Sequence, residues 1–250
     1  MITVVVPVHN EVANIEPLLD KIATATQTVP ITEVIYVDDC SRDGTPAVLE
    51  KACAAYPFLR VICHRGRCGQ SAALWTGISH AQNGIIVTLD GDGQNDPVDI
   101  AKIYDQYCVA GAGRVMVAGQ RKKRHDNVVR RVSSRIANRV RSSLLKDGVR
   151  DAGCSLKLFR RDDFLMLPRM NHLHRFLPVL MQREGVTVVL CDVVHHPRRH
   201  GVSKYGVWNR LWVGIVDLFG VRWLQRRAFD PVDIAEVTKG KPNECVSGAA

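Results

Sequence analysis

Residues 84–97 of this 250-residue chain have the sequence GIIVTLDGDGQNDP. The first half is a short apolar run rich in β-branched residues, which predicts a buried strand. Two carboxylates, Asp90 and Asp92, follow it and are set among glycines. If the extended backbone continues through them, both side chains point the same way, because side chains alternate across a strand. The alternative is an acidic turn that caps the next helix, with Asp96 and Pro97 at its start.

The acidic pair has the composition of a divalent cation site. Two hard oxygen ligands directed at one point suit Mg²⁺ or Mn²⁺, which is commonly bound through one or two carboxylates plus the phosphates of a substrate. The intervening glycines let another group approach the backbone closely. We therefore expect a metal ion and a phosphate-bearing ligand at this segment.

The positive charge of the chain is concentrated in one window. The net charge is +9, and residues 121–146 hold ten Lys or Arg and one Asp, which equals the whole excess. Such a local field predicts an anionic partner, which is phosphate, nucleic acid or acidic lipid.

Cysteine usage and hydropathy limit the class of protein. The eight cysteines include no Cys-x-x-Cys pair, which argues against a zinc or redox motif and predicts reduced thiols, several of them buried. Residues 2–8 predict a first strand rather than a signal peptide, so a cytosolic protein is expected. No run reaches the roughly 18 apolar residues that a membrane span needs. The nearest, Leu211 to Val221, is interrupted by Asp217.

Strands and helices alternate along the first part of the chain. This order predicts an α/β fold, with a mostly parallel sheet and helices on both faces. Ser41 or Thr45 is expected to cap the second helix. Strands are expected at residues 2–8, 33–37, 58–63 and 115–118 and in the run that leads into Asp90. Helices are expected at residues 14–25, 71–81, 97–110 and 129–145, and a further helix is expected to follow the turn at 38–45 and to end at Ala55.

Three polar segments each follow one of these strands directly. They are residues 9–11 (HNE), residues 38–39 (DD), and the pair Asp90 and Asp92. Ligands of open α/β sheets bind at the carboxyl ends of the strands, so we expect the three segments to share one edge. The chain has no GxGxxG fingerprint, phosphate-loop lysine, GxSxG elbow or HExxH motif, which excludes several common enzyme classes.

Four motifs in this order resemble those of the inverting GT-A glycosyltransferases. Three of them are residues 6–11 (VPVHNE), 37–45 (VDDCSRDGT) and 89–97 (LDGDGQNDP). The fourth, residues 198–205 (RRHGVSKY), resembles the subgroup that moves sugars onto polyprenyl phosphates, typified by dolichol-phosphate mannosyltransferase. The resemblance covers residues 2–225, and it implies a GT-A fold with a nucleotide-binding sheet.

The resemblance also implies a role for each matching position. The base and ribose of the donor would be contacted by Pro7, His9, Glu11, Val37 and Asp39, where His9 replaces a frequent aromatic. The metal ion, Mg²⁺ or Mn²⁺, would be held against the donor diphosphate by Asp90, Asp92 and Gln94. Phosphates would be gripped by Arg121, Arg198 and Lys204. Apart from the resemblance, we expect the acceptor phosphate to contact Arg124, Arg131, Arg175 and Ser203, of which Arg175 lies in a segment that resembles one the subgroup places near the acceptor.

The basic window includes a predicted helix at residues 129–145, with an apolar stripe that faces the core. Arg131, Arg135 and Arg139 recur every four residues beside that stripe, and they repel one another unless anions lie alongside. A solvated helix face is one interpretation. Nucleic acid is another, but no aromatic side chains interleave with the basic ones to stack on bases. We favour a wall for the acceptor phosphate and anionic lipid headgroups.

A phosphate acceptor changes what the protein must supply. Transfer to a hydroxyl normally needs a carboxylate base, whereas a phosphate monoester, with a second pKa of about 6, is already anionic. Asp151 stands where hydroxyl transferases often place their base, and its alternative role is to cap a turn. We expect direct displacement with inversion, in which the polyprenyl phosphate attacks and the nucleoside diphosphate leaves, stabilised by the metal and by Arg or Lys.

Two segments near the carboxyl end have open interpretations. His195, His196 and His200 surround Pro197, which argues against helical zinc ligation and favours a loop that closes over the donor at Gly201. Residues 208–223 predict an amphipathic helix with three tryptophans on one side, suited to an anionic bilayer or to packing on protein. The expected division is a catalytic domain at 1–207, an interfacial helix at 208–227 and a polar, disordered tail at 228–250.

The expected partners follow from this resemblance. They are a nucleotide-sugar donor, a polyprenyl phosphate acceptor and the inner face of the cell membrane, with a small membrane protein or a second copy as further candidates and no nucleic acid. Two other functions stay open: a transferase that forms a glycosidic bond with Asp151 as base, and a non-enzymatic nucleotide- or nucleic-acid-binding module. The sequence does not distinguish uridine from guanosine donors, or one sugar from another.

Overall fold

The computed structural model describes residues 1–111, 113–121, 141–149, 151–197 and 207–227, with the backbone alone at 207–213. Residues 141–145 are helical. The strands are β1 (Ile2–Val8), β2 (Ile31–Asp38), β3 (Leu59–Cys63), β4 (Ile85–Thr88), β5 (Val115–Arg121), β6 (Lys157–Arg160) and β7 (Thr187–Val193). The helices are α1 (Val12–Ala25), α2 (Thr45–Ala55), α3 (Gln70–Ser79), α4 (Asp99–Ala110), α6 (Arg161–Leu165), α7 (Leu173–Arg183) and α8 (Val207–Arg226).

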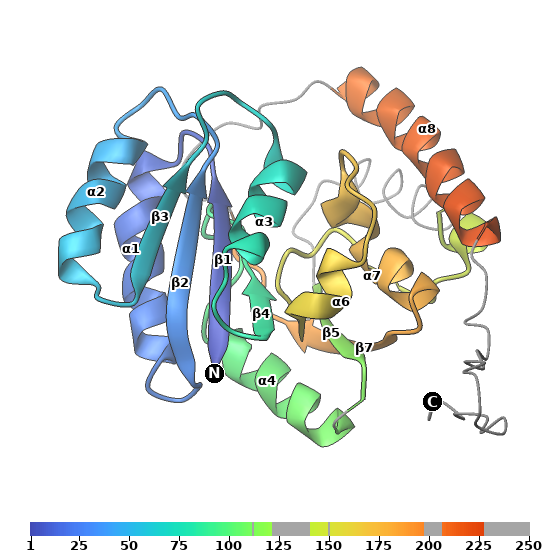
Figure 1. Ribbon diagram of the computed structural model, residues 1–250, viewed down its shortest axis with the longest axis horizontal. Helices are drawn as coiled ribbons and strands as arrows, with labels where there is room; N and C mark the ends of the chain where they lie inside the picture. The colour runs from blue at the N-terminus through green and yellow to red at the C-terminus, as the bar shows by residue number, and fades with distance from the viewer. Residues whose placement is uncertain (112, 122–140, 150, 198–206, 228–250) are drawn as a thin grey trace, which may run out of the picture.

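The strands form one seven-stranded sheet in the order β3-β2-β1-β4-β6-β5-β7 (Figure 1). Strands β1 to β4 run parallel to one another, and β5 runs parallel to β7. Strand β6 is antiparallel to both of its neighbours, β4 and β5. The prediction of a mostly parallel α/β sheet is therefore confirmed, and β6 is the exception that the alternating pattern did not predict.

Helices cover both faces of the sheet, and this explains why every residue of β1 is buried. Val4 and Val6 face the apolar cluster under α1, α2 and α4, whereas Val5 faces the cluster under α3, α6, α7 and α8. Successive side chains of a strand point to opposite faces, so β1 contributes to both clusters. A continuous β-branched run such as residues 2–8 is what this position requires.

The chain turns where β4 ends, and this corrects one prediction. Strand β4 ends at Thr88, and residues 91–92 form a turn, so the extended backbone does not continue through the two carboxylates. Gly91 lies against the end of β1: a Cβ there would be 2.3 Å from Val8 Cγ1. The alternative, an acidic turn before the next helix, agrees with this geometry. Asp96 Oδ1 accepts a hydrogen bond from Val98 N at 3.3 Å just before α4 begins.

The expected cap of α2 is also different from the observed one. Thr45 is the first residue of the helix, and its backbone N–H donates to Asp43 Oδ1 at 3.0 Å. The Ser41 hydroxyl donates instead to Asp38. Neither Ser41 nor Thr45 caps α2, because Thr45 already belongs to the helix and Ser41 lies four residues before it, in the turn after β2.

Helix α8 packs beside α7 at one end of the molecule (Figure 1). Leu218 and Val221 are buried in the apolar cluster that also contains Val5, while Val216, Phe219 and Trp223 are 57–61% exposed. The apolar residues of α8 thus lie on two sides rather than on the single side predicted. Among the described residues, none of the helices has the length and apolar character needed to cross a bilayer.

Candidate active site

The carboxyl ends of β1 and β2 are joined by hydrogen bonds. Asp39 N donates to Val8 O at 2.9 Å, His9 Nδ1 lies 2.8 Å from Asp39 O, and Asn10 N donates to Ser41 Oγ at 2.8 Å. Asn10 and Cys40 have φ of 53° and 60°, in the left-handed region where few non-glycine residues occur. The first two polar segments therefore meet at one edge of the sheet, as expected.

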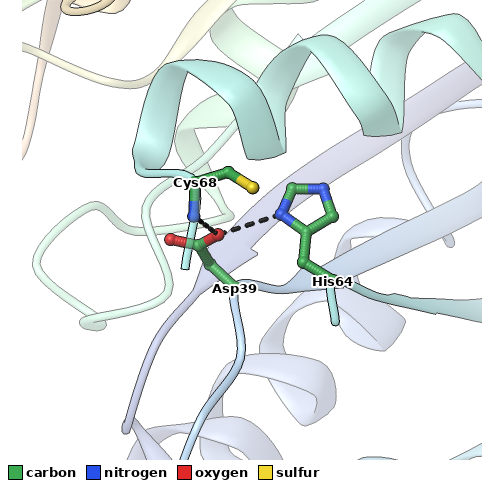
Figure 2. Close-up of side chains that lie close together, drawn as sticks. All are labelled: Asp39, His64 and Cys68. Atoms are coloured by element: carbon green, nitrogen blue, oxygen red, sulfur yellow. Dashed lines mark hydrogen bonds and ion pairs between the residues drawn. The ribbon is translucent and has the colours of Figure 1, made fainter. Parts of the chain in front are cut away.

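The Asp39 carboxylate is held by the loop that precedes α3. It accepts hydrogen bonds from Cys68 N at 2.8 Å and from His64 Nδ1 at 2.9 Å (Figure 2). Gly69 N donates to the other carboxylate oxygen at 2.8 Å. Burial opposes the ionisation of Asp39, but the hydrogen bonds from Cys68, His64 and Gly69 outweigh it and lower its pKa. Asp39 is therefore ionised, and its carboxylate holds the loop before α3 against the end of β2.

Asp39, His64 and Cys68 are also the one group of metal-type ligands found among the described residues, with ligand atoms within 4.8 Å of one another. The hydrogen bonds account for this proximity without a metal. A carboxylate is an acceptor alone, so His64 Nδ1 carries the proton that it shares with Asp39. His64 Nε2 in turn lies 2.9 Å from Thr76 Oγ1, which fixes the ring against α3.

Asp90 occupies the same edge, one strand along. Gln70 Nε2, at the start of α3, donates to Asp90 Oδ1 at 2.7 Å, and Asp90 N donates to Ser155 Oγ at 3.1 Å. Burial, followed by the negative charge of Asp92, raises the pKa of Asp90 to about 6. The Ser155 hydrogen bond and the charges of Lys157 and Arg121 therefore compensate the ionised form of Asp90 only in part.

Asp92 and Gln94 complete the turn. Gln94 N donates to Asp92 Oδ1 at 3.1 Å, and Gln94 Nε2 lies 3.5 Å from His196 O. The oxygens of Asp90, Asp92 and Gln94 are the hard donors that Mg²⁺ or Mn²⁺ prefers. Burial and the repulsion from Asp92 raise the pKa of Asp90, and a divalent cation would offset both, so these residues fit such an ion.

A cavity of about 200 Å³ adjoins Asp90. Two cations, Lys157 and Arg175, line it together with His174, and Arg175 was predicted to contact a phosphate. Burial lowers the pKa of His174 to about 3, so its ring is neutral. The cavity is lined by Gln70, Leu74, Thr88, Leu89, Asp90, Gly153, Ser155, Lys157, His174, Arg175 and Leu177.

Arg121 and Asp151 form a bidentate ion pair. Arg121 Nε and one terminal nitrogen lie 2.5 and 2.6 Å from the two Asp151 oxygens, and the Asp151 side chain is 9% exposed. Arg121 therefore reaches this region at the end of β5, but it already has an anionic partner. The Asp151 carboxylate is likewise occupied, because both of its oxygens contact the Arg121 guanidinium.

The remaining predicted residues differ in what they offer. Val37 is fully buried, so its backbone rather than its side chain is accessible to a ligand, and Pro7 is also buried. Glu11 Oε2 accepts from Asn14 Nδ2 at 2.7 Å. His196 Nε2 lies 2.9 Å from Asp96 Oδ2, so this histidine has a carboxylate partner. Predicted residues that lie outside the described part are Arg124, Arg131, Arg135, Arg139, Arg198, His200, Gly201, Ser203 and Lys204.

Four residues of this region were not predicted from the sequence. Gln70 and Ser155 bind Asp90, and Lys157 and His174 line the cavity beside it. One signal was available, because Lys157 is a single charge within the apolar run Leu156-Lys157-Leu158-Phe159. A lone lysine in a buried strand is uncommon unless it has a charged partner. Gln70 and Ser155 carry no comparable signal.

The model of the family described as "Glycosyl transferase family 2" matches residues 3–165, and the chain belongs to that family. The predicted resemblance to GT-A glycosyltransferases is thereby confirmed.

Curated relatives narrow the group. The chain is 34% identical over 232 residues to the dodecaprenyl-phosphate galacturonate synthase of Rhizobium johnstonii, covering 90% of this chain and 67% of the relative. It is 30% identical over 212 residues to the undecaprenyl-phosphate 4-deoxy-4-formamido-L-arabinose transferase of Aeromonas hydrophila, covering 84% of this chain and 64% of the relative. The curated relatives are thus polyprenyl-phosphate sugar transferases, and the chain spans about two thirds of their length.

Solved structures share the fold. The glucosyl-3-phosphoglycerate synthase of Mycobacterium tuberculosis, in complex with Mn²⁺, UDP and phosphoglyceric acid, superposes with a TM-score of 0.67 at 18% identity, covering 98% of this chain and 85% of that one. A mannosyltransferase of Pyrobaculum calidifontis, in complex with GDP-Man and Mn²⁺, gives 0.65 at 22% identity, covering 92% and 65%.

Proposed function

We propose that the protein transfers a sugar from a nucleoside-diphosphate sugar to a polyprenyl phosphate, with inversion at the anomeric carbon. The observation that carries the proposal is the pair Asp90 and Asp92 at the carboxyl edge of the sheet, beside a cavity that contains two basic side chains. The names of the curated relatives support the same donor and acceptor classes.

The donor would lie across the ends of β1, β2 and β4. The base and ribose would contact the residues that join these ends, which are Pro7, His9, Glu11, Val37 and Asp39. Asp90, Asp92 and Gln94 would hold Mg²⁺ or Mn²⁺, which when bound neutralises charge on the departing diphosphate. Further positive charge would come from Arg198 and Lys204.

The reaction would need positioning more than proton abstraction. The acceptor phosphate is anionic at neutral pH, so one of its oxygens can attack without a base. Arg175 lines the cavity beside Asp90 and would orient that phosphate, together with Arg124, Arg131 and Ser203. The ion pair of Asp151 with Arg121 argues against the alternative transferase, in which Asp151 would be the base. Family membership argues against a non-enzymatic binding module.

We also propose that the protein works at the inner face of the cell membrane. Helix α8 exposes Val216, Phe219 and Trp223, with Arg226 exposed on the same helix. Aromatic side chains beside arginines suit the interface of an anionic bilayer, where a lipid acceptor is found. Residues 208–227 would thus form the docking element of a catalytic domain at 1–207, with residues 228–250 as a tail.

The proposal is tested by a transfer assay with Asp92→Ala. Purified protein is incubated with labelled UDP- and GDP-sugars, undecaprenyl phosphate and Mn²⁺, and the lipid product is extracted. We expect product from the wild type and a loss of at least about 100-fold in the variant, because an anion-stabilising site is removed. Lys51→Met, on the exposed side of α2, is the control that keeps activity. Full activity of Asp92→Ala, or of wild type in excess chelator, would contradict the proposal.

A further inference from the structure

The cavity beside Asp90 contains a buried lysine that the proposed chemistry does not use. Lys157 is 3% exposed and is the first residue of β6. Its backbone pairs with Thr88, two residues before Asp90, so the sheet fixes where its side chain begins. The Nζ atom donates a hydrogen bond to Cys154 O. An ammonium group has three donors, so this bond leaves capacity for a ligand.

A buried ammonium group requires a negative partner. Burial lowers the pKa of Lys157, because the charged form loses its hydration there, while Asp90 and Asp151 act in the opposite direction. Both carboxylates have other cations to balance. Asp151 forms the bidentate pair with Arg121, and Asp90 belongs to the proposed metal site. The neighbouring carboxylates therefore compensate Lys157 in part.

The charge of the cavity lining leads to the same conclusion. Among the eleven lining residues, Lys157 and Arg175 are basic and Asp90 is the one carboxylate. His174 adds no charge, because its ring is neutral. A divalent ion on Asp90 would make the cavity more positive still. A rigid, positively charged cavity lined by strands and helix ends is suited to an oxyanion.

We propose that this cavity receives an oxyanion of a substrate, and that the Lys157 ammonium is its anchor. The oxyanion is either the phosphate of the acceptor or a carboxylate on the transferred sugar, since both present oxygens to an ammonium donor. The inference rests on the proposed function, because that function supplies both substrates. It adds a buried binding residue at the start of β6, on the opposite side of Asp90 from the ends of β1 and β2.

The test measures binding rather than turnover. Isothermal titration in Mg²⁺ compares wild type with Lys157→Met, which keeps the length of the side chain, and with Lys157→Arg, which keeps the charge. The acceptor arm uses geranyl phosphate against geraniol, and the donor arm uses UDP-glucuronate against UDP-glucose. Lys51→Met is the matched control for removal of one positive charge at an exposed site.

We expect Lys157→Met to lose about tenfold or more in affinity for the anionic probe of one arm, the size of one charge-assisted hydrogen bond. Its affinity for the matched probe that lacks the tested oxyanion, geraniol or UDP-glucose, should change less than about twofold, and Lys157→Arg should recover part of the loss. The arm that responds identifies the oxyanion. Circular dichroism and the melting temperature show whether each variant is folded.

Two results would overturn the inference. One is a folded Lys157→Met that binds both anionic probes as tightly as wild type. The other is a wild-type protein that binds neither anionic probe. Failure of the proposed function is separate, because it is measured as absence of a glycosylated lipid from the wild type, whatever Lys157→Met binds.

Discussion

Two aspartates at the same edge of the sheet have opposite electrostatic environments. Asp39 accepts two backbone N–H bonds and one from His64, and its pKa lies below the usual value. Asp90 faces Asp92, and burial together with that charge raises its pKa to about 6. Environments that separate the pKa values of neighbouring carboxylates also separate their roles. Asp39 anchors the loop before α3. Asp90 is the carboxylate whose ionised form a bound cation would stabilise most.

The raised pKa of Asp90 predicts pH-dependent metal binding. A cation competes with the proton, so affinity should rise as pH increases through about 6 and fall about tenfold between pH 7 and pH 5. Titration calorimetry with Mn²⁺ at the two pH values measures this. In Asp92→Asn the like charge is absent, so the pKa of Asp90 should fall and the pH dependence should move to lower pH. An affinity independent of pH in wild type would contradict the assignment.

The same shift affects stability in the absence of metal. The folded-state pKa of Asp90 lies above its unfolded value of 3.8, so the penalty is absent below about pH 4 and grows as pH rises. It is complete above about pH 6 and amounts to at most about 3 kcal/mol. Urea unfolding of metal-free protein should therefore show Asp90→Asn gaining stability relative to wild type at pH 7 but not at pH 4. An equal difference at both values would refute the linkage.

Asp151 separates the two enzymatic interpretations. Asp151→Asn removes a charge from the buried pair with Arg121, so we expect a loss of about 3–5 kcal/mol in stability. Transfer to a polyprenyl phosphate by the folded fraction should fall less than about tenfold, because an anionic acceptor needs no base. A loss of about a thousandfold in kcat at unchanged folded fraction would instead identify Asp151 as the base. Initial rates, corrected for folded fraction by circular dichroism, decide between them.

At the scale of elements, the site depends on how closely the β4 turn approaches β1. A Cβ at Gly91 would lie 2.3 Å from Val8 Cγ1 and 3.2 Å from Pro7 O. Val8 is β-branched and buried, so it has little freedom to move away. The glycine therefore sets the distance between the first polar segment and the acidic pair.

Gly91→Ala should lower the free energy of unfolding by about 1–3 kcal/mol through overpacking. Gly84→Ala is the control from the other end of β4, because a Cβ at Gly84 would have no atom within 4 Å. Urea denaturation of both variants measures the difference. Equal stability of the two variants would show that the turn can move away from β1, and it would remove the basis for this distance argument.

At the scale of the whole molecule, α8 has one side in the core and one side outside. Leu218 and Val221 pack inward, Asp217 pairs with His172 at 2.8 Å, and Gln225 donates to Leu145 O at 3.0 Å. Fixed in this way, α8 presents Phe219 and Trp223 outward from one end of the molecule. The same attachment would set the orientation of the catalytic edge on a bilayer.

Flotation with vesicles that contain anionic lipid tests this orientation. The double variant Phe219→Asp, Trp223→Asp should reduce the membrane-bound fraction at least about tenfold. Two interfacial aromatic side chains are then replaced by negative charges, which the anionic bilayer repels. Val109→Asp is the control, because Val109 is 87% exposed on α4. If the double variant floats as wild type does, α8 is not the docking element.

The order of elements up to β5, and the edge of the sheet at which the candidate site lies, could be predicted because they follow from local properties of the sequence. The β-branched runs and the polar segments after them are contiguous, and parallel strands carry such segments to one edge. The four motifs are also contiguous, which is why the family was recognisable from residues such as Asp39, Asp90 and Asp92. The predicted helix and strand ends differ from the observed ones by a few residues, because local patterns define ends poorly.

The tertiary structure decided which distant residues meet. Three features depend on contacts between segments far apart in the chain. They are the ion pair of Arg121 with Asp151, the antiparallel strand β6 that buries Lys157 near Asp90, and the division of the apolar residues of α8 between two sides. No local periodicity encodes such contacts. They arise when burial of apolar area selects one packing of the elements, and the charges of the site are then balanced by the neighbours that this packing supplies.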